Sequence, residues 1–146
     1  MSKRKGKNLN HARNMDIDAW RERQVISRLK ARLAESNRQF ALEHAGDTDE
    51  QLRELVRRKA AEKGRMLHPL ELPGGDYLKS RLGDWNRLAV MIGYPPLRDR
   101  QGERAYRRLF DREAELFAQE RRARKKEKRM KAQQKREHSR AISESQ

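Results

Sequence analysis

Apolar side chains recur at helical spacing near the start of the chain, separated by polar ones. The first stripe follows spacings of three, four and seven residues and consists of Ile26, Leu29, Leu33 and Phe40, with Ile17 and Trp20 close to it. Asn14 or Asp16 can cap the start of a helix, and Gly46 can end it. The pattern predicts an amphipathic helix over residues 15–46, roughly 42 Å long at the usual rise per residue. Trp20 can belong to a core, a partner contact or a surface on which bases stack.

A second helix is predicted over residues 48–64. Thr48 and Gln51 have the spacing of a capping box, in which each side chain bonds to the other residue's backbone. One face of this segment is apolar and contains Leu52, Leu55, Val56 and Ala60. Gly64 is expected to end the helix, because glycine readily adopts the left-handed conformation found there.

Two very short helices are predicted on either side of Gly83. Pro69, Pro73 and the pair Gly74–Gly75 interrupt the chain, and a helical turn around Leu70 fits between the prolines. Asp76 is expected to cap the first short helix and Asp84 the second, before Gly93 ends it. The predicted core residues are Leu82, Trp85, Leu88 and Ile92, with Ala89 on the same face. Helices this short need such a shared core, because isolated ones are unstable in water.

The last helix is predicted over residues 101–136 and runs into a basic tail. Its apolar stripe contains Tyr106, Leu109, Phe110, Leu116 and Phe117. Residues 1–14 and 137–146 lack apolar periodicity and are predicted to be disordered. Because no segment alternates like a strand, the expected fold class is all-α. The expected arrangement is a helix-turn-helix-like module over residues 48–97, between two long amphipathic helices with basic disordered ends.

Charge favours a polyanionic partner. The 146 residues carry a net charge of +15, and 40% of them are charged. The cations gather at the ends: residues 1–14 carry five Lys or Arg and no acid, and residues 121–136 carry ten and one acid. Cysteine is absent and no apolar run reaches the roughly 18 residues of a membrane span, so a cytoplasmic protein at the nucleoid or ribosome is expected, with no membrane partner.

Arg, Asn and Lys are the residue types that contact base edges and phosphates. In the short-helix region, the candidate nucleic-acid-binding residues are Lys79, Arg81, Asn86 and Arg87. Phosphate-gripping candidates at the amino end are Lys3, Arg4, Lys5 and Lys7. Those in the basic tail are Arg121, Arg122, Arg124, Lys125, Lys126, Lys128 and Arg129. A solvated face without a ligand is the alternative for the first set.

The stretch from Leu52 to Leu97 contains a helix end at Gly64, Pro69 shortly after it, the run from Arg81 to Asn86, and Ile92-Gly93. In these features it resembles the homing-endonuclease-associated repeat. The family's usual Phe-Gly-Ser-Trp-Asn is here Leu-Gly-Asp-Trp-Asn, and Ile92 replaces an alanine. The resemblance implies a single copy of a helix-turn-helix-like module that contacts DNA without catalysis, and the nuclease half is missing.

Catalytic chemistry is not predicted. No nucleophile–base pair or phosphate-binding loop can be assembled from these residues, and we expect no cofactor and no small-molecule substrate. His44, Asp47, Asp49 and Glu50 are predicted to join two helices and not to bind a metal. The predicted function is a DNA-binding accessory protein. An RNA-binding or ribosome-associated protein and a helical adaptor, including a homodimer formed through the amphipathic helices, remain the alternatives.

Overall fold

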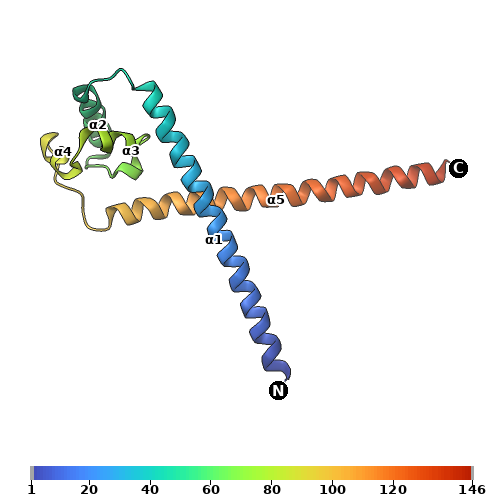
Figure 1. Ribbon diagram of the computed structural model, residues 1–146. Helices are drawn as coiled ribbons and strands as arrows, with labels where there is room; N and C mark the ends of the chain where they lie inside the picture. Colours follow the sequence, from blue (N-terminus) through green and yellow to red (C-terminus); the bar gives the residue numbers. More distant parts are fainter. Residues whose placement is uncertain (1, 146) are drawn as a thin grey trace.

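The computed structural model describes the backbone of residues 2–145 and the side chains of residues 16–145, and in this part of the chain it contains helices and no strand. The all-α prediction is confirmed. In chain order the elements are α1 (Ser2–Glu43), α2 (Asp49–Lys63), the 3-10 helix η1 (Pro69–Glu71), α3 (Gly75–Leu82), α4 (Trp85–Met91) and α5 (Gln101–Glu144). The four short elements form a head, and α1 and α5 are long helices that cross beside it (Figure 1).

Both ends of the chain differ from the sequence prediction. Helix α1 extends back to Ser2 and α5 extends on to Glu144, whereas residues 1–14 and 137–146 are expected to be disordered. Within both helical extensions there is no proline, and most residues are good or tolerable helix formers. Once a helix is nucleated, each added residue gains a hydrogen bond, so the two helices continue where apolar periodicity has ended.

Local capping signals position α2. Thr48 Oγ1 accepts from the backbone N–H of Gln51, and Gln51 Oε1 accepts from that of Thr48 at 2.8 Å. Gly64 ends α2 in the left-handed conformation, with φ of 71°. Both features match the capping box and the glycine stop expected from the sequence.

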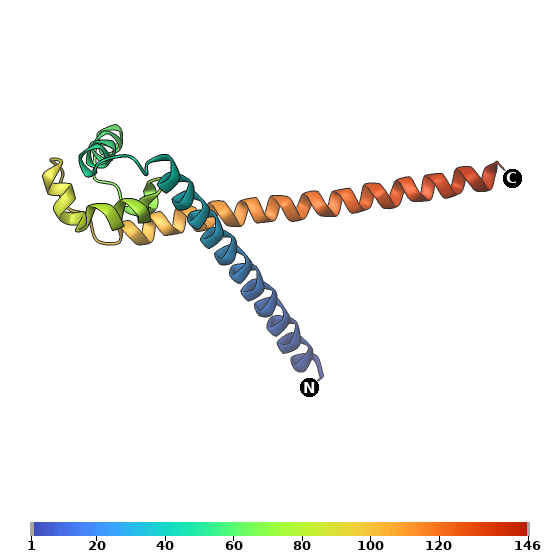
Figure 2. The same cartoon turned by 45° about the horizontal axis from the view of Figure 1, so that its top comes forward.

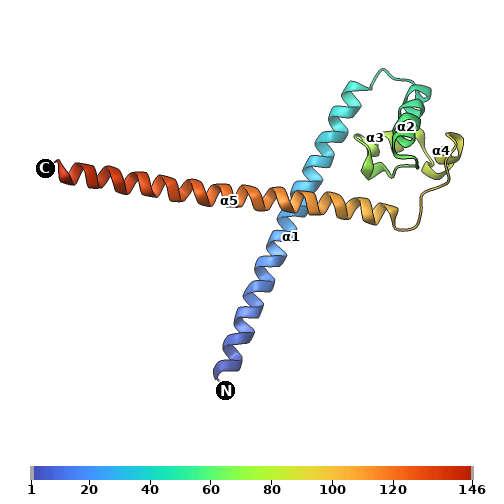
Figure 3. The ribbon, with the colours of Figure 1, turned by 180° about the vertical axis from the view of Figure 1, so that it is seen from behind.

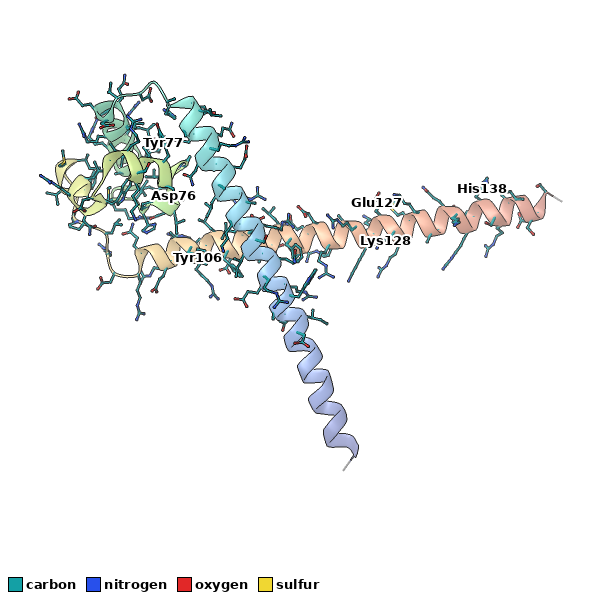
Figure 4. The ribbon with its side chains drawn as sticks, in the orientation of Figure 1. Asp76, Tyr77, Tyr106, Glu127, Lys128 and His138 are labelled. Atoms are coloured by element: carbon teal, nitrogen blue, oxygen red, sulfur yellow. The ribbon has the colours of Figure 1, made fainter. Side chains whose placement is uncertain are left out.

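The start of α3 differs from the prediction that Asp76 caps it. The helix begins at Gly75, its cap position is Gly74, and Asp76 lies inside the first turn. Asn37 of α1 acts in its place: its Oδ1 accepts from the backbone N–H of Asp76, and its Nδ2 donates to the Asp76 carboxylate. Figure 4 shows Asp76 and Tyr77 in the head, on the side that faces α1. A residue 39 positions earlier in the chain therefore completes this helix end.

The core lies in the head and centres on α2, α3 and α4. Trp85 is 6% exposed, and its indole Nε1 donates to the carbonyl of Leu67 at 2.8 Å. Leu88 is buried, and Leu82 and Ile92 are half-buried against the same cluster. Asp84 caps α4 by accepting from the backbone N–H groups of Asn86 and Arg87. The break at Gly83 separates α3 from α4, so the indole and the cap hold two distinct short helices together.

A network around Glu71 attaches the start of α5 to the head. The Glu71 carboxylate accepts from Arg65 at 2.6 Å and 3.0 Å, from Gln101 Nε2 at 3.1 Å and from the backbone N–H of His68 at 3.1 Å. Gln101 also donates to the carbonyl of Met66 at 2.8 Å. Burial acts to raise the pKa of Glu71, but these hydrogen bonds outweigh it and lower the pKa to about 2.

The middle part of α1 crosses the first half of α5, and the views in Figures 1, 2 and 3 agree on this. Beyond the crossing, the amino-terminal part of α1 and the carboxy-terminal part of α5 diverge as two arms, on the side away from the head (Figure 3). Among the described side chains of α1, the buried apolar ones are Val25, Leu29 and Phe40. Over the residues described, no helix is both long and apolar enough to cross a lipid bilayer.

Candidate nucleic-acid interface

Three of the four polar candidates in the head are free to meet a ligand. Lys79, Asn86 and Arg87 are exposed, and among the described residues none of their side chains forms an ion pair or a side-chain hydrogen bond. On α4, Asn86 and Arg87 share the outer face with two exposed apolar side chains, Val90 and Met91, which are 62% and 63% exposed. This surface can contact a partner without any rearrangement of the core.

The fourth candidate, Arg81, is half-buried and bonded to other groups of the head. Its guanidinium donates to the Asp49 carboxylate at 2.7 Å, to the Tyr77 hydroxyl at 2.7 Å and to the carbonyl of Asp47 at 3.1 Å. These bonds tie α3 to the start of α2. Because its donors are occupied by groups of the same chain, Arg81 has a structural task in this conformation and few donors left for a base edge.

The basic tail lies on the free part of α5. From Arg122 to Ser145 every side chain is exposed, and Figure 4 shows Glu127, Lys128 and His138 on the segment that projects beyond α1. Arg122 pairs with Glu115 at 3.3 Å and Lys131 with Glu127 at 3.1 Å. In the described part of the chain, the tail cations without an ion pair include Arg124, Lys125, Lys126, Lys128 and Arg129. The tail is therefore an exposed cationic rod.

The amino-terminal candidates Lys3, Arg4, Lys5 and Lys7 lie on α1, and their side chains fall outside the described residues.

A buried carboxylate holds the crossing of the two long helices. Glu113 of α5 is 2% exposed. Its carboxylate accepts from Arg32 of α1 at 2.7 Å and 3.1 Å, and the Arg28 guanidinium lies 3.6 Å away. Arg28 also donates to Glu120 at 2.6 Å. In the sequence Glu113 stands between Arg112 and Ala114. A glutamate at such a position of an amphipathic helix looks like an ordinary solvent-facing residue, so no sequence signal reveals its burial.

An open cleft lies where α1 and α5 begin to diverge, next to the crossing. Its volume is about 260 Å³, and its lining residues are Arg21 and Val25 of α1 with Ala114, Phe117, Ala118, Arg121, Arg122 and Lys125 of α5. Trp20 lies beside this cleft, with its ring centroid 6.0 Å from that of Phe117. The Arg121 guanidinium lies 5.3 Å from the Trp20 ring and 5.8 Å from the Phe117 ring. Apolar surface, aromatic rings and cations therefore meet at one place.

The acidic connection between α1 and α2 contains a local pair. His44 Nδ1 lies 2.6 Å from the Asp47 carboxylate, and the His44 ring stacks on Phe40 at 4.1 Å. Asp49 is occupied by Arg81. Within residues whose side chains are described, no group of three or more His, Cys, Asp or Glu side chains has the arrangement of a metal site.

Comparison with known proteins identifies no family for this chain. No protein-family model matches the sequence, and neither the curated proteins nor the solved structures contain a significant match.

Proposed function

We propose that this protein binds nucleic acid without catalysis, gripping the phosphate backbone with its cationic helical arms. The observation that carries the proposal is the exposed, largely unpaired set of cations on the free part of α5. Such a surface binds polyphosphate chains because contact with phosphates releases the counterions condensed on them.

The charge density of the tail suits a nucleic acid. Residues 121–136 carry ten cations and one acid, and as a helix they extend about 24 Å at the usual rise. Duplex DNA carries about fourteen phosphate charges over that length, at one charge per roughly 1.7 Å. The helix therefore meets an opposite charge density of the same order along its whole length. Arg121, Lys125, Lys128 and Lys135 follow one line at spacings of four, three and seven residues, which continues from Phe117.

Duplex DNA is the partner that we propose first, in keeping with a DNA-binding accessory protein. The head adds Lys79, Asn86 and Arg87, which are exposed and of the types that contact phosphates and base edges. Arg81 is not included, because its guanidinium bonds to Asp49, Tyr77 and Asp47. The resemblance to a DNA-contacting helical repeat remains a prediction.

RNA is the second candidate, and the position of Trp20 favours it. An indole that is 41% exposed beside several cations suits unpaired bases, which are abundant in the loops and bulges of folded RNA.

A salt series tests the proposal. If the arms neutralise about six phosphates of duplex DNA, log K falls against log salt with a slope near −5. Changing Lys126, Lys128, Arg129 and Lys131 to Gln is expected to flatten the slope by up to about 3.6, since each lost phosphate contact contributes about 0.9.

The matched control removes the same charge elsewhere, by changing Lys30, Arg58, Lys59 and Lys63 to Gln. These four residues are exposed on α1 and α2. The slope of this control is expected to stay close to that of the unchanged protein. A slope near zero for the unchanged protein excludes the proposal, and equal slopes for the two variants exclude the tail as the gripping element. Competition between duplex DNA and structured RNA at equal salt orders the two candidates.

A further inference from the structure

The two tryptophans of this chain have opposite environments. Trp85 is 6% exposed and its indole N–H is bonded in the head, whereas Trp20 is 41% exposed at the opening between the arms. The indole of Trp20 contacts Phe117, whose ring centroid is 6.0 Å away in a tilted arrangement, and the Arg121 guanidinium, 5.3 Å from the ring. An exposed aromatic ring held in place in this way offers a prepared platform for another flat ring.

Cationic side chains line the cleft beside Trp20. The cleft beside Trp20 is lined by Arg21, Arg121, Arg122 and Lys125, and no Asp or Glu occurs among the described residues that line it. Only Arg122 of these four has an ion pair, with Glu115 at 3.3 Å, among the residues described. The cleft is therefore complementary to an anion, and its apolar lining residues Val25, Ala114, Phe117 and Ala118 are complementary to an apolar ring.

We propose that this cleft binds a single-stranded nucleic-acid segment, with an unpaired base stacked at Trp20 and the adjoining phosphates on Arg21, Arg121 and Lys125. The inference rests on the proposed function and names the part of the nucleic acid that this site takes. Stacking on aromatic side chains next to a cationic track is how proteins bind single strands without reading sequence, because every base has a π face.

Size and accessibility favour an unpaired base over other ligands. A volume of about 260 Å³ lies below the roughly 300–1,000 Å³ of sites that enclose a whole small-molecule ligand. A duplex keeps its bases stacked inside, so only its phosphates could reach the cleft. A segment with a free base uses the aromatic platform and the cations together.

Fluorescence of the full-length protein tests the inference directly. The probes are a ten-residue oligouridylate, a ten-residue oligodeoxyuridylate, a blunt-ended GC-rich duplex of ten base pairs, and inorganic polyphosphate. The two single strands are expected to quench Trp20, whereas the duplex and polyphosphate bind with little quenching. Trp85 is buried and is expected to stay silent, so the quenching should disappear in Trp20→Phe. Quenching by only one of the two strands supports the site and identifies the sugar that it prefers.

Affinity measurements with matched variants complete the test. Trp20→Ala is expected to weaken single-strand binding about tenfold and polyphosphate binding less than about twofold. Trp20→Phe is expected to keep most of the affinity, and circular dichroism checks that both variants remain folded. Arg121→Ala is expected to weaken single-strand binding more than Arg129→Ala, which removes one charge from the tail outside the cleft.

Two results would overturn the inference in different ways. Binding of all the nucleic acids with no change in Trp20 fluorescence, or an equal loss for single strands and polyphosphate in Trp20→Ala, removes the stacking site and leaves the proposed function standing. Failure of the unchanged protein to bind any of the probes at low salt removes both.

Discussion

Arg32 on α1 and Glu113 on α5 form a two-pronged ion pair across the helix crossing, with N···O distances of 2.7 Å and 3.1 Å. The two residues are 81 positions apart in the chain, and the glutamate side chain is only 3% exposed. Arg28 stands 3.6 Å from the same carboxylate. Because this pair joins α1 to α5 at their crossing, it helps set the angle at which the two cationic arms diverge.

Glu113→Gln is expected to lower the free energy of unfolding by about 2 kcal/mol, because two guanidinium groups lose the carboxylate between them. The loss is smaller than for a fully buried pair, since the Arg32 side chain is 59% exposed and water screens it. Urea denaturation followed by circular dichroism measures the change. The control is Glu115→Gln, whose carboxylate side chain is 63% exposed, and it should cost less than about 0.5 kcal/mol. Equal losses in the two variants would show that the crossing does not depend on Glu113.

Arg81→Gln is expected to lower the thermal midpoint without weakening nucleic-acid binding at a temperature where the protein is folded. The guanidinium joins α3 to Asp49 and to the carbonyl of Asp47, so its removal loosens the head. Arg87→Gln is the matched variant, because Arg87 is exposed and unpaired among the described residues. It should leave the midpoint unchanged and weaken binding. If Arg81→Gln instead weakens binding and leaves the thermal midpoint unchanged, Arg81 belongs to the nucleic-acid interface.

Gly75→Ala is expected to destabilise the head by about 3 kcal/mol or more, or to prevent folding, because the added methyl group has no space. A Cβ at this position would lie 1.8 Å from the carbonyl oxygen of Pro69, which is backbone and cannot rotate away. Gly46→Ala is the control, since nothing lies within 4 Å of its Cβ. Its free energy of unfolding should change by less than about 1 kcal/mol. If Gly75→Ala is as stable as the control, η1 and α3 do not pack as closely as described.

Acid is expected to weaken the attachment of α5 to the head through Glu71. Its pKa in the folded protein is about 2, below the ordinary value of about 4.3 for the unfolded chain. A lowered folded pKa means that the stabilisation is complete above the unfolded pKa and is lost as the pH falls from about 4.3 towards 2. About 2 kcal/mol of stability should disappear over this range.

Comparison with Glu71→Gln isolates this contribution, because other carboxylates also titrate in acid. Urea midpoints at pH 7, 4 and 2.5 should show the unchanged protein approaching the variant as the pH falls. Glu62→Gln, whose side chain is 66% exposed, serves as the charge control. A gap between protein and variant that is constant across these pH values contradicts the assignment.

What the sequence determined by itself is the set of features whose causes lie within one or two helical turns. The capping box of Thr48 and Gln51, the stop at Gly64, the break at Gly83 and the cap at Asp84 all involve neighbours along the chain. The inward face that contains Trp85 follows from spacing alone. The all-α class and the cationic character of the tail follow from the same local information.

Only the tertiary structure decided which residues meet across the chain. It pairs Arg32 with Glu113, assigns Arg81 to Asp49, places Asn37 at the start of α3 and sets Trp20 against Phe117. The physical reason is that helical periodicity identifies a face and its polarity but not the angle or register at which two faces pack. A charged residue buried at a crossing therefore looks in the sequence like any other residue of a solvated helix.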